Sequence, residues 1–317
     1  MESMTLRDDP VVAAAFEWLA LACGGTKWSD TADHLLIDGR VAAPGARRRG
    51  CRSGCGRGDA LLCATNGVRM HAIKLEAIVD QWSGLKDRAV IPLDVANYLG
   101  RVKVPRKVVF RSVNVENGVR TVTAFSDSAR FDCFSRSYQF QADQISWPDP
   151  RLLIDFPDTR IEIGATVAKG IEAMARIASA DRYALLEVAA IDGNVIVSQC
   201  CGGNADSPSV PVGAIRSRAP IFMADVAHDY VLACVVPAQH LADALSIVNT
   251  AGAMNETGNL DIGFGGLGAL SCSSDGNAES AGPLYIGGGC WTAVVGASAW
   301  EPTWTPDDGY IVKKRQP

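Results

Sequence analysis

The stretch Val90-Ile91-Pro92-Leu93-Asp94-Val95-Ala96-Asn97-Tyr98-Leu99 joins the end of a strand, through a proline, to a short helix. It recurs in the second half of the chain as Val235-Val236-Pro237-Ala238-Gln239-His240-Leu241-Ala242-Asp243-Ala244-Leu245. Proline suits the first turn of a helix, because the N–H that it lacks has no partner there. An internal repeat of this kind determines the architecture before any single motif does.

A longer helix and a hairpin precede each copy of this stretch. Apolar spacing predicts helices at 11–23 and 165–179 and hairpins at 34–42 and 183–199. The first hairpin is expected to turn at Asp38-Gly39. In helix 165–179, Lys169, Glu172 and Arg176 are expected opposite the apolar side. We therefore expect two similar domains, 1–157 and 158–297, and a tail at 298–317.

The composition is that of a soluble, well-packed protein. Of the 317 residues, 48% are hydrophobic and 21% are charged. No apolar run approaches the roughly 18–20 residues that cross a bilayer, and the N-terminus lacks a basic signal-type region. A cytoplasmic protein without a membrane partner is expected. The net charge of −5 excludes a generic polycation but allows a local basic surface.

The segment 45–58 differs in composition from the rest of the chain and is expected to be a loop. It contains five arginines that could meet phosphates, although a solvated loop tip is an equal alternative: Arg47, Arg48, Arg49, Arg52 and Arg57. Cys51 and Cys55 could hold a metal or form a redox pair, but they offer two metal ligands without a second pair nearby, so no metal centre is expected. The other cysteines, scattered over the chain, are expected to be buried free thiols.

No catalytic constellation is visible. The segment 263–268 fits the dinucleotide pattern G-x-G-x-x-G, but the residues after it resemble a strand, so a glycine-rich hairpin is predicted there. None of the four histidines lies beside a Ser or Cys nucleophile. We expect no enzymatic activity and no cofactor. A metal- or small-molecule-binding enzyme that uses the Cys- and Gly-rich loops is the alternative from a different class.

Four segments of the chain resemble the bacterial DNA polymerase III beta subunit, the sliding clamp. They are Leu62-Cys63-Ala64-Thr65-Asn66-Gly67-Val68-Arg69-Met70, then Val90-Ile91-Pro92, then Ser146-Trp147-Pro148-Asp149-Pro150-Arg151, and finally Pro283-Leu284-Tyr285-Ile286 followed by Trp291–Val295. The resemblance covers the middle and last domains of that family, and nothing corresponds to its first. Val294-Val295-Gly296-Ala297 stands where the family has a C-terminal Met-Pro-Met.

This resemblance implies an α+β fold of two DNA-clamp-like domains, each with two helices packed on antiparallel sheets. It further implies a processivity factor that encircles double-stranded DNA without sequence preference. The DNA-binding residues expected from it are Lys169, Arg176, Arg101 and Lys103, together with the loop residues Arg47, Arg48, Arg49 and Arg52. Helices 11–23 and 238–249 bring almost no positive charge. The second hypothesis is a monomeric accessory protein that binds DNA without forming a closed ring.

The resemblance also implies an apolar groove for short motifs of a replicative polymerase and a clamp loader. Carried over by position, it comprises Thr65, Gly67, Val68, Arg69, Met70, Pro148, Leu153, Pro283, Val294 and Val295. For Leu153, Val294 and Val295 an ordinary core position is the alternative. Family rings contain six similar domains, so a chain with two of them is expected to form a homotrimer.

Overall fold

The computed structural model groups the chain into two compact units. Unit 1 comprises Met1–Asp155, Thr250–Gly252 and Cys290–Thr292, and unit 2 comprises Phe156–Asn249, Ala253–Gly289 and Ala293–Pro317. The residues described are 2–7, 9–24, 33–39, 55, 59–83, 88–101, 108–114, 119–126, 134–141, 147, 149–154, 157, 160–182, 184–191, 194–200, 214–218, 221–222, 230–250, 253–254, 258–265, 269–271, 282–297, 300–305 and 309–314.

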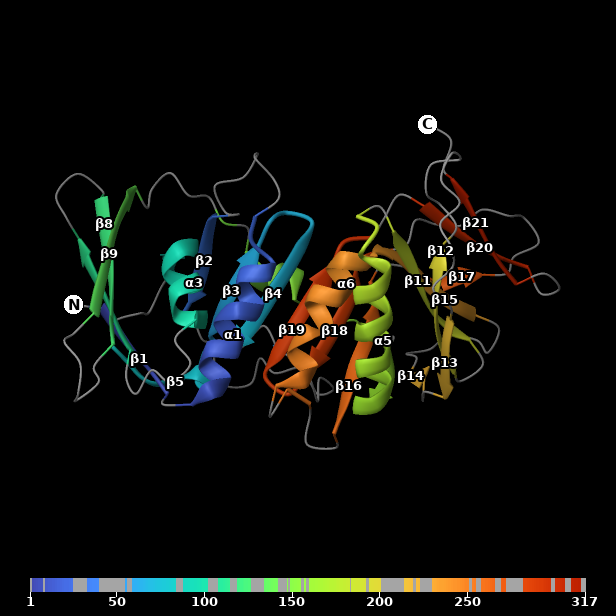
Figure 1. Cartoon of the computed structure of the whole chain (residues 1–317), viewed down its shortest axis with the longest axis horizontal. Coiled ribbons are helices and arrows are strands. Elements are labelled where there is room, and N and C mark those ends of the chain that lie inside the picture. The colour runs from blue at the N-terminus through green and yellow to red at the C-terminus, as the bar shows by residue number, and fades with distance from the viewer. Residues whose placement is uncertain are drawn as a thin grey trace. The chain divides into compact units, whose positions relative to one another are not determined.

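Unit 1 is built from two copies of a strand, a helix and an antiparallel meander (Figure 1). The first copy is β1 (Glu2–Leu6), α1 (Pro10–Leu21), β2 (His34–Asp38), β3 (Leu61–Thr65) and β4 (Arg69–Lys74), followed by α2 (Leu75–Ile78) and β5 (Val79–Ser83). The second is β6 (Arg88–Pro92), α3 (Leu93–Arg101), β7 (Val108–Asn114), β8 (Val119–Ser126) and β9 (Phe134–Gln141), followed by α4 (Pro150–Leu153).

The two copies exchange their first strands. β1 pairs with β7 of the second meander, and β6 pairs with β2 of the first, both antiparallel. The resulting strand orders within unit 1 are β5-β1-β7-β8-β9 and β4-β3-β2-β6. This reciprocal pairing joins the two copies into one body, because each meander carries the first strand of the other copy.

Unit 2 repeats the scheme. Its first copy is β10 (Arg160–Gly164), α5 (Ala165–Ala178), β11 (Leu185–Ile191), β12 (Asn194–Cys200), β13 (Ala214–Arg218) and β14 (Ile221–Phe222). Its second is β15 (Tyr230–Pro237), α6 (Ala238–Leu245), the 3-10 helix η3 (Ser246–Asn249), β16 (Asn259–Phe264), β17 (Ala269–Ser271), β18 (Leu284–Gly288) and β19 (Trp291–Val295). β10 pairs with β16 and β15 with β11, the same exchange as in unit 1. A hairpin of β20 (Trp300–Thr305) and β21 (Gly309–Lys314) follows.

In each unit two helices lie side by side against the sheet, α1 with α3 and α5 with α6 (Figure 1). α1 buries Val12, Phe16 and Leu19 fully. Gly100 of α3 makes the close approach to α1 possible, because a Cβ there would lie 2.7 Å from Glu17 Cγ and 3.0 Å from its backbone nitrogen. The predicted fold class, two similar units with paired helices on antiparallel sheets, is confirmed.

Some local predictions are confirmed and others are wrong. Helix 165–179 and the hairpin β11–β12, which closes at Ile191 and Asn194, are as predicted. Asp38-Gly39 is not a hairpin turn, because Asp38 pairs with Leu61 of β3 and Arg88 of β6. The repeated proline ends the strand and does not lie in the first turn: Pro237 is the N-cap of α6, with an extended backbone.

The glycine-rich segment also differs from its prediction. A strand does follow β16, as expected, but β16 pairs with β10 and β18 whereas β17 pairs with β15. The two strands therefore belong to different sheets and form no hairpin. A dinucleotide fingerprint requires a helix after the glycines, and β17 stands in that place. Over the described residues, no helix is both long and apolar enough to cross a membrane.

Candidate functional site

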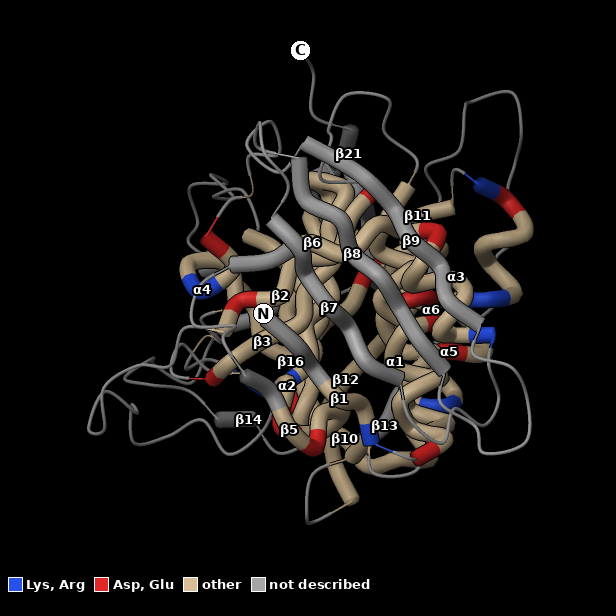
Figure 2. Tube along the Cα trace, turned by 90° about the vertical axis from the view of Figure 1, so that its left-hand side faces the viewer, with Lys and Arg blue, Asp and Glu red and all other residues tan. Residues whose placement is uncertain are grey.

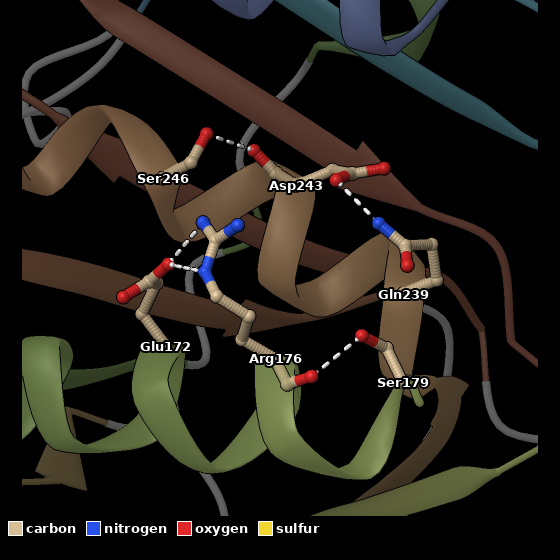
Figure 3. Close-up of polar contacts among 6 residues, drawn as sticks. All are labelled: Glu172, Arg176, Ser179, Gln239, Asp243 and Ser246. Atoms are coloured by element: carbon tan, nitrogen blue, oxygen red, sulfur yellow. Dashed lines mark hydrogen bonds and ion pairs between the residues drawn. The ribbon is translucent and has the colours of Figure 1, made fainter. Parts of the chain in front are cut away.

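The exposed face of α5 carries the two cations predicted to meet DNA. Lys169 and Arg176 are both exposed. Arg176 Nε donates to Glu172 Oε1 at 2.8 Å, and a second bond joins the same pair through Nη2. The Glu172 side chain is 9% exposed against 61% for Arg176, so the prediction that Glu172 lies opposite the apolar side is wrong. Arg176 neutralises a nearly buried carboxylate, and Figure 3 shows its guanidinium directed from α5 towards α6.

α6 presents a buried acid to the same helix pair. Asp243 is 6% exposed, and its Oδ1 accepts a hydrogen bond from Gln239 Nε2 at 2.7 Å (Figure 3). Its backbone oxygen accepts from Ser246 Oγ at 2.8 Å, where α6 passes into η3. Glu172 and Asp243 thus give this helix pair two buried carboxylates, which offset the positive charge that Arg176 brings to its surface.

The four long helices together do not carry an excess of basic residues. α1, α3, α5 and α6 contain three Lys or Arg residues against four Asp or Glu residues. Figure 2 shows acidic as well as basic positions along the described chain. Arg101 is exposed at the end of α3. The remaining predicted DNA-binding residues lie outside the described part of the chain: Lys103, Arg47, Arg48, Arg49 and Arg52.

The turn between β3 and β4 is rigid for reasons that its sequence supplies. Asn66 Oδ1 accepts from the N–H groups of Val68 and Arg69, both at 3.1 Å. Thr65 Oγ1 accepts from Gly67 N at 3.1 Å and donates to Arg69 O at 2.7 Å. Gly67 has φ of +86°, a left-handed conformation that glycine adopts without strain. The turn holds Val68 in a fixed, 45% exposed position.

The same turn closes the C-terminal end of α1. Asn66 Nδ2 donates to Gly24 O at 3.1 Å, and the Arg69 guanidinium donates to the carbonyl of Leu21. A cation there also interacts favourably with the helix dipole. Below them, the His71 ring stacks on Trp18 with centroids 4.2 Å apart, and its Nδ1 lies 2.8 Å from Trp18 O. Arg69 therefore has a structural role that sequence reasoning missed.

Leu153, a further predicted groove residue, is carried by α4. Asp149 caps this short helix by accepting from Arg151 N at 3.2 Å. Arg151 Nε lies 3.6 Å from Oδ2 of the fully buried Asp38, which fixes α4 beside β2. Leu152 and Leu153 remain 68% and 39% exposed. Two large apolar side chains on an anchored turn form an accessible apolar surface.

The Val68 turn follows the last residue of β3, whereas Arg151 of α4 contacts Asp38, which pairs with the first residue of β3. Asp38 pairs with Leu61 at the start of β3, and the turn follows Thr65 at its end. At about 3.3 Å per residue the two ends are about 13 Å apart, which an extended peptide of about four or five residues covers.

The other predicted groove residues contribute less exposed apolar surface than Val68 and Leu153. Thr65 and Met70 are 4% and 3% exposed, so they support the turn from below. In unit 2, Val294 and Val295 are buried, as the alternative core reading expects. Pro283 O accepts from Gly265 N at 2.9 Å. Pro148 lies outside the described residues. Within the described residues no three His, Cys, Asp or Glu side chains gather as metal ligands.

Comparison with known proteins finds similarity in the fold but not in the sequence. No protein-family model matches the sequence, and no curated protein matches it. Solved structures do match. The Caulobacter crescentus beta sliding clamp superposes with a TM-score of 0.59 at 11% identity, over 93% of this chain and 65% of that one. A DNA polymerase III beta subunit from Eubacterium rectale gives 0.57 at 10% identity, over 93% and 65%.

The proliferating cellular nuclear antigen of Entamoeba histolytica gives a TM-score of 0.54 at 10% identity, over 94% of this chain and 98% of that chain. The chain thus spans about two thirds of the bacterial beta subunits and nearly the whole of this shorter protein. The resemblance inferred from four short segments is confirmed at the level of the fold. With its twice-repeated exchange of strands, this chain has the fold of the DNA sliding clamps.

Proposed function

We propose that the protein is a sliding clamp, a processivity factor without catalytic activity that encircles duplex DNA and tethers a replicative polymerase. The observation that carries the proposal is the coverage: the clamp fold accounts for 94% of this chain and 98% of the Entamoeba protein. A closed ring cannot leave DNA sideways, so weak phosphate contacts suffice for retention. This fits helices whose acidic residues outnumber their basic ones.

Ring closure would use the end strands of the two units. Residues 290–292 group with unit 1, where Lys74 N of β4 donates to Cys290 O at 2.8 Å. β4 ends the first meander of unit 1, and β13 is its counterpart in unit 2. β9 ends the second meander of unit 1 as β19 does in unit 2. β9 and β13 are the terminal strands of their five-stranded sheets.

An unpaired strand edge invites pairing with another chain. We infer that β9 of one protomer pairs with β13 of the next. Such head-to-tail contacts are heterologous and close into a ring only when the rotation per subunit divides a full turn. With two units per chain, three chains provide the six units of a clamp ring.

Phosphate contacts in this ring would come from Lys169, Arg176 and Arg101, supplemented by Lys103 and the arginines at 47–52. The partner groove would be formed by Val68 on its turn and Leu153 on α4, both exposed. Its ligand would be an extended peptide with apolar side chains, supplied by the polymerase or the clamp loader.

The decisive experiment compares circular and linear DNA. Light scattering should give a mass three times 33.6 kDa. The trimer, mounted on a nicked circular duplex, should withstand a high-salt wash and should be lost when the circle is linearised. A linear duplex with both ends blocked by bound protein is the matched control and should retain it. A monomer that stays equally on circular and linear DNA would instead establish the accessory protein that grips without closing.

A further inference from the structure

Cys55, in the segment between β2 and β3, is held by contacts to two other parts of the chain. Its side chain is 1% exposed, its N–H donates to Thr292 Oγ1 at 2.7 Å, and its thiol donates to Ala72 O at 3.4 Å. A second thiol contact, also 3.4 Å, joins Cys55 Sγ to the carbonyl oxygen of Cys290. Cys290 groups with unit 1, so these contacts all lie within one compact unit.

The two thiols are free and share one charged neighbour. Both Cys55 and Cys290 are reduced in the structure, the first buried and the second partly exposed. Burial raises the pKa of both thiols, and the Lys74 ammonium opposes this rise in each of them. Lys74 Nζ lies 3.4 Å from Asp59 Oδ2, and its backbone N–H holds the Cys290 carbonyl at 2.8 Å. Lys74 thus holds the backbone of Cys290 through its own N–H, and its ammonium group acts on the thiols of both Cys55 and Cys290.

We propose that Cys55 and Cys290 are a redox-active pair that forms a disulfide bond on exposure to a hydroperoxide. The partly exposed Cys290 thiolate attacks the terminal peroxide oxygen, which gives a sulfenic acid and releases water or alcohol. The Cys55 sulfur then attacks the sulfenic sulfur. The S–S bond forms as hydroxide departs with the Cys55 proton as water. Overall, two thiols lose two electrons and the peroxide is reduced.

Position and charge support this assignment over chance proximity. The buried Cys55 is shielded from direct attack by an oxidant, and its sulfur lies against the backbone of Cys290, which solvent reaches. Burial disfavours both thiolates, and the ammonium of Lys74 opposes that effect, so it increases the thiolate fraction available to each step. The bond would fasten the backbone at Cys55, between β2 and β3, to the backbone at Cys290. In a reducing compartment such a bond is transient and regulatory.

The test treats the full-length protein with hydrogen peroxide and measures intact mass and disulfide-linked peptides after digestion without reductant. The expected product lacks two hydrogen atoms and yields one peptide pair joined through Cys55 and Cys290. Cys55→Ser and Cys290→Ser should each abolish it, and circular dichroism checks their folding. Cys234→Ser is the matched control: Cys234 is also buried, its thiol donating to Gly282 O at 3.5 Å, and its loss should change nothing.

The charged neighbours give a readout that a purely structural role would not produce. Lys74→Met should slow disulfide formation several-fold, because the thiolate loses its cation. Asp59→Asn should accelerate it, because Asp59 raises the pKa of the Cys55 thiol. The wild-type rate should rise with pH as the thiolate fraction grows. An unchanged mass after treatment, a linkage between other cysteines, or equal rates in the two charge variants would each overturn the proposal.

Discussion

The guanidinium of Arg69 donates a hydrogen bond to the carbonyl oxygen of Leu21, the last residue of α1. This bond joins the turn that presents Val68 to the end of a helix whose side chains fill the core. A sequence motif that resembles part of a peptide-binding site thereby serves first as a helix cap. The two roles are separable, because Arg69 points to the helix end while Val68 is exposed.

Arg69→Met should lower the free energy of unfolding by about 1–3 kcal/mol, because it removes a charged donor from a helix terminus. Chemical denaturation followed by circular dichroism measures the loss. Val68→Asp is the matched control from the next position, and it should leave the unfolding free energy within about 0.5 kcal/mol of wild type. Equal stability of Arg69→Met and wild type would show that the bond to Leu21 contributes nothing.

Lys169 and Arg176 should respond differently to charge reversal, although both are exposed cations on α5. Lys169→Glu should weaken DNA binding and reduce the slope of log K against log salt by about 0.9 for each phosphate that the variant no longer neutralises, without a change in melting temperature. Arg176→Glu should lower the melting temperature as well, since it places a carboxylate beside the nearly buried Glu172.

Glu17→Lys serves as the opposite control for that pair. Glu17 is the acidic residue of α1 and is exposed, so its reversal should strengthen DNA binding if the helices face the duplex. Fluorescence anisotropy at several salt concentrations measures all three variants. A Lys169→Glu variant with the wild-type salt slope would contradict the assignment of α5 to the DNA surface.

Glu187 should make the stability of the protein depend on pH. It lies on β11 opposite Ser198 and Val235 and is 2% exposed, and burial raises its pKa from 4.5 to about 7. Between these values the folded protein holds the proton and the unfolded chain does not. The free energy of unfolding therefore falls as pH rises through this window, by about 3 kcal/mol in total.

Glu187→Gln removes this proton linkage and keeps the shape of the side chain. It should be more stable than wild type at high pH, above this window, and the two proteins should converge as the pH approaches the unfolded-state pKa. Urea denaturation at closely spaced pH values gives the comparison. Parallel curves for the two proteins across the window would show that Glu187 titrates normally.

The architecture was predictable from the sequence because the repeat and the apolar periodicity are local signals. Helix α5 and the hairpin β11–β12 follow from spacing alone. The pairing of β2 with β3 could not be predicted in this way. Asp38 pairs with Leu61 across a long connecting segment, and the sequence of that segment does not indicate the pairing. The burial of Glu172 was equally hidden, because it depends on Arg176 and on the packing of α5 against α6.

Binding of an apolar peptide should depend on Val68 and Leu153 together. Both side chains are apolar, no larger than leucine, and exposed on rigid supports, Val68 at 45% and Leu153 at 39%. Met70 is buried, so a charge there would unfold the turn and would not test the groove. Val68→Asp with Leu153→Asp should raise the dissociation constant of the polymerase's C-terminal peptide at least about tenfold, because each spoiled pocket costs roughly 1–3 kcal/mol.

Ile177→Asp is the matched control. Ile177 is another apolar residue, on α5, and is 62% exposed, so this variant should bind the peptide as tightly as wild type. Calorimetry with the trimer, whose mass is checked for every variant, decides the outcome: tight binding by the double variant would place the groove on another surface of the protein.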